Sequence, residues 1–222
     1  MKSWIKQIGC FCLCMFGCLL SVEAQENQVY EIPFDKGTLL LTPLQDNAVR
    51  IRYVEGEMKE LPEWVYVQTD NNDIKCKRKD TKAGVSLKLK QMNVIVDQQA
   101  KLLTATDRDG NVVFKAKAHE LKAATVQQEP TRDATLVIES PADEYLYGLG
   151  QFQDGYLNVR GLTRRLTQVN TQIAIPFLLS NKGYGLLWNN YGLTNFNPTT
   201  GKVELQRAGA TGQQVTVNVT ST

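Results

Sequence analysis

The sequence predicts an all-β protein built as a large antiparallel β-sandwich. From position 28 onward it consists of short segments in which apolar and polar residues alternate with a period of two, rich in Val, Ile, Leu, Thr and Tyr. No stretch keeps a 3.6-residue apolar period for even three turns, which argues against helices. A chain of 222 residues is long enough to bury a sizeable core between two sheets.

The first 24 residues predict an exported protein. Lys2 and Lys6 form a basic start, and the apolar run Ile8–Leu20 is too short to span a bilayer comfortably. Small residues lead up to Ala24, so we expect a signal peptide over 1–24 and a mature domain over 25–222. A lipoprotein with Cys18 as the lipidated residue is the alternative. Either reading places the protein in the periplasm or at the cell surface.

Composition excludes several classes of function. Twenty-five basic and 23 acidic side chains give a net charge of +2, so we expect no nucleic-acid partner. The basic run Lys75–Lys79 is neutralised by neighbouring aspartates and is expected to be a solvated loop. Cys76 alone remains after cleavage, and one histidine, His119, is expected at the surface or in a turn. These residues cannot form a zinc cluster or a histidine-based triad, so we expect no metal and no cofactor.

The first two thirds of the chain alternate regularly between strands and turns. Gly37, the 45–47 segment and Arg108–Asn111 are expected turns, Asp-Gly being a strong hairpin signal. Glu55–Pro62 carries no strand pattern, and Trp64–Thr69 is a candidate short strand. The expected strands are Val29–Phe34, Thr38–Leu44, Ala48–Val54, Val85–Lys90, Met92–Asp97, Leu102–Thr106, Val112–Lys117, Glu120–Gln128 and Thr135–Glu139.

Asp143–Tyr191 holds the densest mixture of glycine, aromatic and side-chain amide residues in the chain. Tyr147–Gln151, Ile175–Ser180 and Lys182–Trp188 are short apolar strands interrupted by glycine, which indicates close backbone approach at a sheet edge or at the mouth of a site. The later segments are expected to be the strands Leu193–Phe196, Val203–Arg207 and Val215–Val219, with a turn at Pro198–Gly201. The last strand breaks off at Thr222, so we expect the sandwich to be incomplete.

Two kinds of sugar chemistry are candidates in this stretch. Asp143, Glu144 and Asp154 could serve glycosidic acid–base work only as a facing pair, and their positions in turns favour structural roles. Saccharide binding would use aromatic faces and hydrogen-bonding side chains, although aromatic residues in strands are more often core. The candidates are Tyr145, Tyr156, Trp188 and Tyr191 for the first, and Gln151, Gln153, Asn158, Arg160, Gln168, Asn170, Asn189 and Asn190 for the second.

The segments Tyr147-Gly148-Leu149-Gly150-Gln151, Pro176-Phe177 and Ser180-Asn181-Lys182-Gly183-Tyr184-Gly185 resemble, in order and spacing, the N-terminal β-sandwich domain of glycoside hydrolase family 31. Asn158–Gly161 and Gln168–Thr171 look most like exported bacterial α-xylosidases that act on xyloglucan fragments. The resemblance implies a galactose-mutarotase-like sandwich packed on a (β/α)₈ barrel.

The resemblance also implies where the chemistry lies. The family's two catalytic aspartates belong to the barrel, which would begin after Thr222, so we expect no catalytic residue here and an inactive fragment. The loop Leu166–Ile173 would reach the substrate subsite, with Gln168 and Asn170 as substrate-binding candidates. Many relatives carry Trp-Asn-x-Asp there, and this chain has neither Trp nor Asp in the loop. The implied partners are a xyloglucan-type or α-glucoside oligosaccharide and the catalytic barrel.

A free-standing carbohydrate-binding sandwich is the alternative function. A mutarotase is a third reading, but mutarotases use two histidines with a glutamate, and His119 alone cannot supply them.

Overall fold

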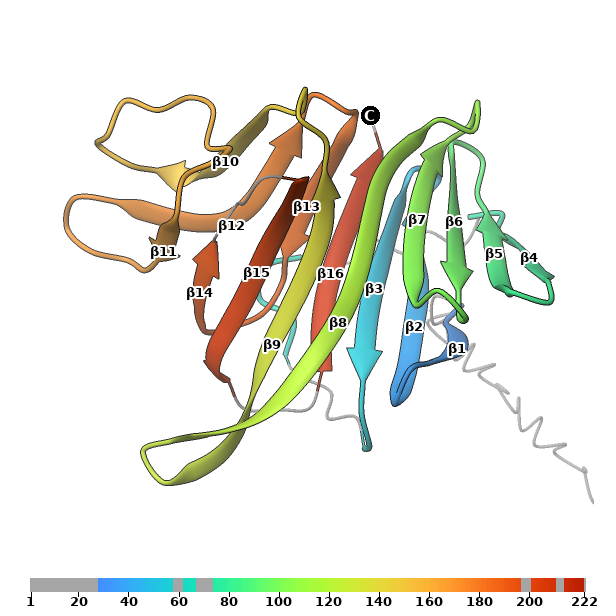
Figure 1. Ribbon diagram of the computed structural model, residues 1–222, viewed down its shortest axis with the longest axis horizontal. Helices are drawn as coiled ribbons and strands as arrows, with labels where there is room; N and C mark the ends of the chain where they lie inside the picture. The colour runs from blue at the N-terminus through green and yellow to red at the C-terminus, as the bar shows by residue number, and fades with distance from the viewer. Residues whose placement is uncertain (1–27, 58–61, 67–73, 197–200, 211–213, 222) are drawn as a thin grey trace, which may run out of the picture.

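The computed structural model describes residues 28–57, 62–66, 74–196, 201–210 and 214–221, which form sixteen antiparallel strands in two sheets and contain no helix (Figure 1). The all-β, antiparallel prediction is therefore confirmed for this part of the chain. The expected signal peptide over 1–24, Cys18 and most of the Pro198–Gly201 turn lie outside the described residues.

The seven-stranded sheet, sheet A, has the strand order β1-β2-β3-β16-β13-β12-β10. In that order its strands are Tyr30–Phe34, Gly37–Gln45, Ala48–Val54, Gln214–Ser221, Tyr184–Trp188, Ile173–Ser180 and Leu146–Gln151. The nine-stranded sheet, sheet B, has the order β11-β14-β15-β9-β8-β7-β6-β5-β4. Its strands are Arg164–Leu166, Leu193–Phe196, Gly201–Ala210, Glu129–Ser140, Val112–Val126, Leu102–Asp107, Met92–Asp97, Gly84–Lys88 and Lys77–Asp80.

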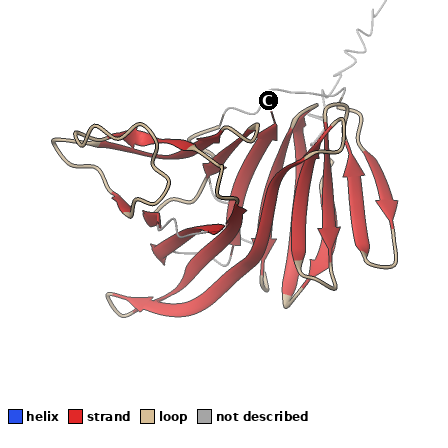
Figure 2. Ribbon diagram, turned by 45° about the horizontal axis from the view of Figure 1, so that its top comes forward, coloured by secondary structure: helices blue, strands red, loops and turns tan. Residues whose placement is uncertain are grey.

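The core lies between the inner faces of the two sheets, and strand alternation produces it. In β1 the side chains of Tyr30, Ile32 and Phe34 are buried while the intervening residues are exposed. β3 alternates in the same way and turns Val49, Ile51 and Tyr53 inward. Each large apolar side chain buried in this way contributes about 1.5–3 kcal/mol of transfer free energy, so the two inner faces hold the sheets together. Figure 2 shows the resulting two-layer arrangement, with strands throughout.

Two short edge strands were not predicted. Lys77–Asp80 is not the solvated loop we expected but strand β4, which pairs with β5. All four of its side chains are exposed, so it has no apolar alternation for sequence analysis to detect. Arg164–Leu166 is the edge strand β11, paired with β14. In the predicted segment Trp64–Thr69, residues 64–66 are not in a strand, and the remainder lies outside the described residues.

His119 is buried in the core, not exposed as the sequence suggested. The pairing of β8 with β9 shifts register between Ala116 and His119. This bulge reverses the inward and outward alternation, so that a residue expected outside turns inside. The imidazole packs against Phe34 and Tyr53 with ring centroids 6.1 and 6.0 Å away, and its Nδ1 has no hydrogen-bond partner among the described residues.

Burial of His119 should make stability depend on pH. Burial lowers the pKa of the imidazole from 6.5 to about 4. His119 is therefore protonated below pH 6.5 in the unfolded chain but only below about pH 4 in the native chain. The free energy of unfolding should therefore fall by up to about 3 kcal/mol as the pH drops through this window. Urea unfolding at a series of pH values measures it. His119→Phe keeps an aromatic ring and should remove this part of the slope; equal slopes would contradict the assignment.

The pairing of β10 with β12 is broken by a bulge between Gly148 and Gly150. The three consecutive residues Gly148, Leu149 and Gly150 have φ angles of 111°, 67° and 101°. This backbone turns the Leu149 side chain into the core, where it is fully buried. A Cβ on Gly150 would lie 2.0 Å from the Ile173 carbonyl oxygen, so only glycine fits. The Tyr-Gly-Leu-Gly motif is thus a backbone requirement of the strand pair.

Replacing Gly150 by alanine should therefore be severe. We expect Gly150→Ala to lower the free energy of unfolding by about 3 kcal/mol or more, because positive φ and a backbone clash act together. Gly161→Ala is the matched control: Gly161 has a φ of 82°, and a Cβ there would meet nothing within 4 Å. The control should lose only about 1 kcal/mol. Urea titration compares them, and similar losses in the two variants would show that the close approach at Gly150 is unimportant.

Candidate functional site

A buried carboxylate joins the two glycine-rich motifs at one end of the sandwich. Glu144 is 1% exposed, and its Oε1 accepts a hydrogen bond of 2.5 Å from the Ser180 hydroxyl. The Ser180 Oγ in turn accepts from the Lys182 backbone N–H at 3.0 Å. Asn181 adds hydrogen bonds in both directions: its Oδ1 accepts from the Tyr145 N–H, and its own backbone N–H donates to the Tyr145 carbonyl. This motif clamp, residues 143–145 with 180–182, fixes the start of β10 against the end of β12.

The other two candidate carboxylates are also used structurally. Asp143 forms an ion pair of 2.5 Å with Lys182, whose hydrogen bond lowers the pKa of the Asp143 carboxyl. Asp154 forms an ion pair of 2.5 Å with Arg164, which also lies over the Phe152 ring. Asp143 and Asp154 thus each have a cationic partner within the described structure. These are structural roles, as the turn positions suggested.

A cavity of about 730 Å³ opens beside the motif clamp. Its charged lining comes from Lys115, Lys117, Glu139, Asp143, Glu144 and Lys182. Glu139 pairs with Lys115 at 3.0 Å and with Lys117 at 3.1 Å, which lowers the pKa of its carboxyl. The charges of Lys115, Lys117 and Lys182 are thus matched by Glu139 and Asp143, whereas Glu144 Oε2 is buried without a hydrogen-bond partner among the described residues.

The loop between β11 and β12 carries the two predicted substrate-binding residues. This loop projects from one end of the molecule, on the left in Figure 1. An isolated bridge joins Val169 to Gln172, and the Gln172 side-chain amide donates to the Thr167 carbonyl at 2.9 Å. Gln168 accepts a hydrogen bond of 2.9 Å from the Ala174 N–H, so its carbonyl oxygen holds the loop in shape. Asn170 is exposed at the tip, and its amide has no hydrogen bond within the described structure.

The outward face of β12 is apolar. Ile173, Ile175, Phe177 and Leu179 are 50%, 49%, 36% and 42% exposed, and together they form what we call the apolar stripe. An antiparallel sheet with one wet face normally places polar residues at such positions. β12 lies between β10 and β13, so this is the open face of an internal strand rather than a frayed edge. A contiguous apolar surface of this kind marks a site of contact with another body.

Cross-strand pairing shows which residues share this face. Phe177 pairs with Leu187, Leu187 with Asn218, and Asn218 with Arg50. Directly paired residues lie on the same face of a sheet, so Arg50 points outward on the same side as Phe177. Tyr147 joins them through its pairing with Leu179.

The aromatic and amide candidates from the sequence are divided by the structure. Trp188 is fully buried in the core, whereas Tyr145 and Tyr156 are 51% and 62% exposed. Asn158 Oδ1 accepts from the backbone N–H groups of Leu146 and Arg160 and is therefore structural. The remaining candidates are exposed at Gln151 and Gln153 and buried at Asn190.

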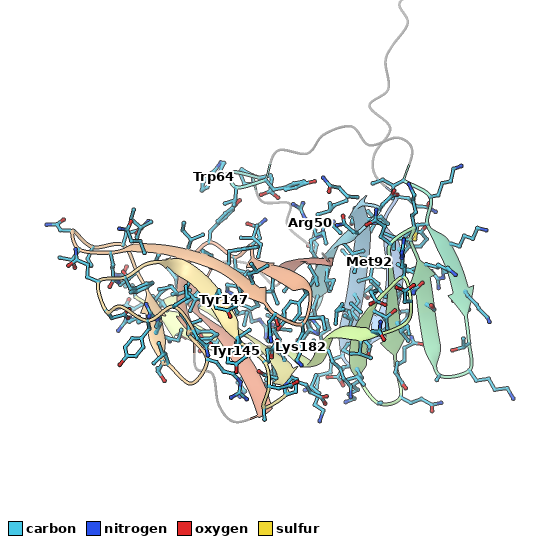
Figure 3. The ribbon with its side chains drawn as sticks, turned by 90° about the horizontal axis from the view of Figure 1, so that it is seen from above. Arg50, Trp64, Met92, Tyr145, Tyr147 and Lys182 are labelled. Carbon is cyan, nitrogen blue, oxygen red and sulfur yellow. The ribbon has the colours of Figure 1, made fainter. Side chains whose placement is uncertain are left out.

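Tyr191 and Asn189 meet two residues that the sequence analysis did not single out. Trp64 stacks on Tyr191 with ring centroids 5.1 Å apart, and the Asn189 amide donates to Glu63 at 3.1 Å. Glu63 and Trp64 lie more than 120 residues earlier in the chain. Figure 3 shows Trp64 projecting from the face on which Arg50 lies, away from Tyr145 and Lys182. Nothing in the local sequence around Trp64 predicts this pairing.

Two absences hold for the described residues alone. Within them, no group of three His, Cys, Asp or Glu side chains is arranged to hold a metal ion. The same part of the chain contains no helix long and apolar enough to cross a membrane.

Comparisons with known proteins agree with this geometry. The chain is 29% identical over 172 residues to an α-xylosidase of Saccharolobus solfataricus, which covers 73% of this chain and 23% of the relative. Its fold is similar to a family 31 α-xylosidase from a soil metagenome, solved with xylose (TM-score 0.76, 21% identity, 88% of this chain and 32% of that one). A Flavobacterium johnsoniae dextranase solved with isomaltotriose gives a TM-score of 0.69 at 18% identity, covering 88% of this chain and 26% of that one.

The chain thus spans about a quarter to a third of the length of these proteins. The family described as the glycosyl hydrolase 31 N-terminal galactose mutarotase-like domain matches residues 38–197, most of the described sandwich. The chain belongs to this family of glycosyl hydrolase 31 N-terminal domains.

Proposed function

We propose that the chain is the N-terminal, non-catalytic β-sandwich of an exported α-glycosidase of the α-xylosidase type. In this role it supports a catalytic barrel and lends the loop Leu166–Ile173 to the substrate subsite. Family membership and the likeness to an α-xylosidase support the assignment. The substrate is an oligosaccharide of the xyloglucan or α-glucoside type, and the N-terminal segment 1–24 directs export.

The observation that carries this proposal is the apolar stripe beside the loop tip. Four outward apolar side chains on an internal strand need a covering surface, and the loop that leads into this strand carries Asn170. A sandwich that binds sugar by itself has no need for such a stripe. A sandwich that packs on a larger catalytic body does, and the packing would bring Asn170 toward the substrate.

The catalytic role is tested by sequencing the gene past codon 222 and expressing the polypeptide that it encodes. We expect that polypeptide to hydrolyse an aryl α-xyloside and the 222-residue chain to be inactive. In the longer enzyme, Asn170→Ala should lower kcat/KM about tenfold, the loss expected for one substrate hydrogen bond, with an unchanged Tm. Gln153→Ala, which removes an exposed amide outside the loop, is the control. An active 222-residue chain, or equal kinetics in the two variants, would contradict the proposal.

The apolar stripe makes a second prediction, for the chain alone. We expect the 222-residue chain to self-associate as its concentration rises, because the stripe is open to solvent. Ile175→Thr combined with Phe177→Thr keeps strand-forming residues at exposed positions and should restore a monomer. Light scattering after size-exclusion chromatography measures the molar mass. Leu157→Thr, at a residue 78% exposed outside the stripe, should change nothing; a wild-type monomer at high concentration would refute the prediction.

A further inference from the structure

Trp64 is a large aromatic side chain held in solvent on an ordered turn. Its side chain is 76% exposed, although one ring face stacks on Tyr191 with the planes 27° apart. The stacking leaves the other face of the indole open. The stacked pair therefore presents an aromatic face in a defined position, available to a ligand with a complementary apolar face.

The turn that carries Trp64 is fixed by a network of polar contacts around Glu63. The Trp64 backbone N–H donates to the Tyr191 hydroxyl at 2.9 Å. Glu63 accepts hydrogen bonds from Asn189 at 3.1 Å and from the Tyr66 N–H at 3.2 Å, and it forms an ion pair of 2.6 Å with Arg50. Arg50 also lies over the Tyr66 ring, 5.3 Å from its centroid. The ring is therefore preorganised, and a ligand need not order it on binding.

The surroundings of Trp64 favour a neutral, hydroxylated ligand. Arg50 and Glu63 neutralise each other beneath the ring, so neither an anion nor a cation is attracted. The Trp64 indole N–H makes no hydrogen bond within the described structure and can donate to a ligand. A pyranose ring presents an apolar C–H face that can stack on the indole and hydroxyl groups that can reach the polar edge.

The same surroundings distinguish Trp64 from the apolar stripe. In sheet A, β13 and β16 lie between β12 and β3, so two strands separate the stripe from the Arg50–Glu63 pair. Asn189 and Tyr191 border Trp64 with polar atoms, whereas the stripe is aliphatic and aromatic throughout. A protein surface complementary to the stripe would leave the polar groups around Trp64 unmatched.

We propose that Trp64 and Tyr191, with Glu63 and Asn189 at the edge, form a saccharide-binding surface for the neutral pyranose units of an oligosaccharide. This goes beyond the proposed function, because the surface lies apart from the loop Leu166–Ile173 and holds sugar without taking part in hydrolysis. It would keep an oligosaccharide on the protein while another part of the same molecule is processed.

The test is a titration of the 222-residue chain, at low protein concentration, with a xyloglucan oligosaccharide and with isomaltotriose. Tryptophan fluorescence is the readout, because Trp64 is exposed while Trp188 is fully buried, and a parallel titration of residues 25–222 removes the third tryptophan, Trp4. We expect saturable binding of at least one of the two sugars. Trp64→Ala should weaken it at least about tenfold, as for an aromatic anchor, and Trp64→Phe should retain part of it. Isothermal titration provides the affinities of variants that lack Trp64.

Matched variants decide the outcome. Tyr156→Ala removes another exposed aromatic ring and should bind as the wild type does. Absence of saturable binding to either sugar, or binding that survives Trp64→Ala, would overturn the proposal. So would binding lost in Asn170→Ala, which would move the sugar to the loop. None of these results affects the proposed supporting role, which depends on hydrolysis by the longer polypeptide.

Discussion

The hydrogen bond between the Ser180 hydroxyl and the buried Glu144 carboxylate is the contact on which the projecting end of the sandwich depends. The carboxyl group is 1% exposed and depends on its neighbours for hydrogen bonds: Oε1 is bonded to Ser180, while Oε2 has no partner among the described residues. Ser180 supplies that bond and at the same time accepts the Lys182 N–H, so one side chain fixes both motifs. The register of β10 against β12, with Leu146 opposite Ser180, follows from this clamp.

Once that register is set, the bulge at Gly148–Gly150 determines the path of β10 along β12. The positive φ angles turn Leu149 into the core, and after the shift in pairing the last residue of β10, Gln151, lies opposite the first residue of β12, Ile173. The pair β10 and β12 extends from one end of the sandwich (Figure 2), and the apolar stripe on β12 is exposed. Burial of its inward residues, such as Leu178, gives enough stability to leave the apolar stripe exposed. The same geometry that makes the loop reach outward thus creates a surface that needs covering.

The sequence predicted what depends on local pattern and missed what depends on pairing. Strands such as β3 and β6 alternate cleanly, so their existence and facing follow from period two. His119 was misplaced because a bulge shifts the alternation of β8, and a bulge leaves no mark in composition. β4 was missed because backbone hydrogen bonds alone make it a strand. At the candidate site, Asn170 stays a prediction from the position of its loop in the family resemblance. Trp64 meets Tyr191 across 127 positions, a contact that only the three-dimensional fold brings together.

The outward face of sheet A changes its chemistry from one side to the other. At β12 the outward side chains are apolar, so a hydrophobic surface could cover them. At β3 the outward Arg50 is already bound to Glu63, so that end has its charges matched within the chain. A partner that covers both ends must be apolar over the stripe and hydrogen-bonding over the turn, which a single flat protein surface rarely is. The two ends are more simply explained by two occupants: a protein surface that removes apolar area from water at β12, and a small hydroxylated ligand that exploits one open aromatic ring at Trp64.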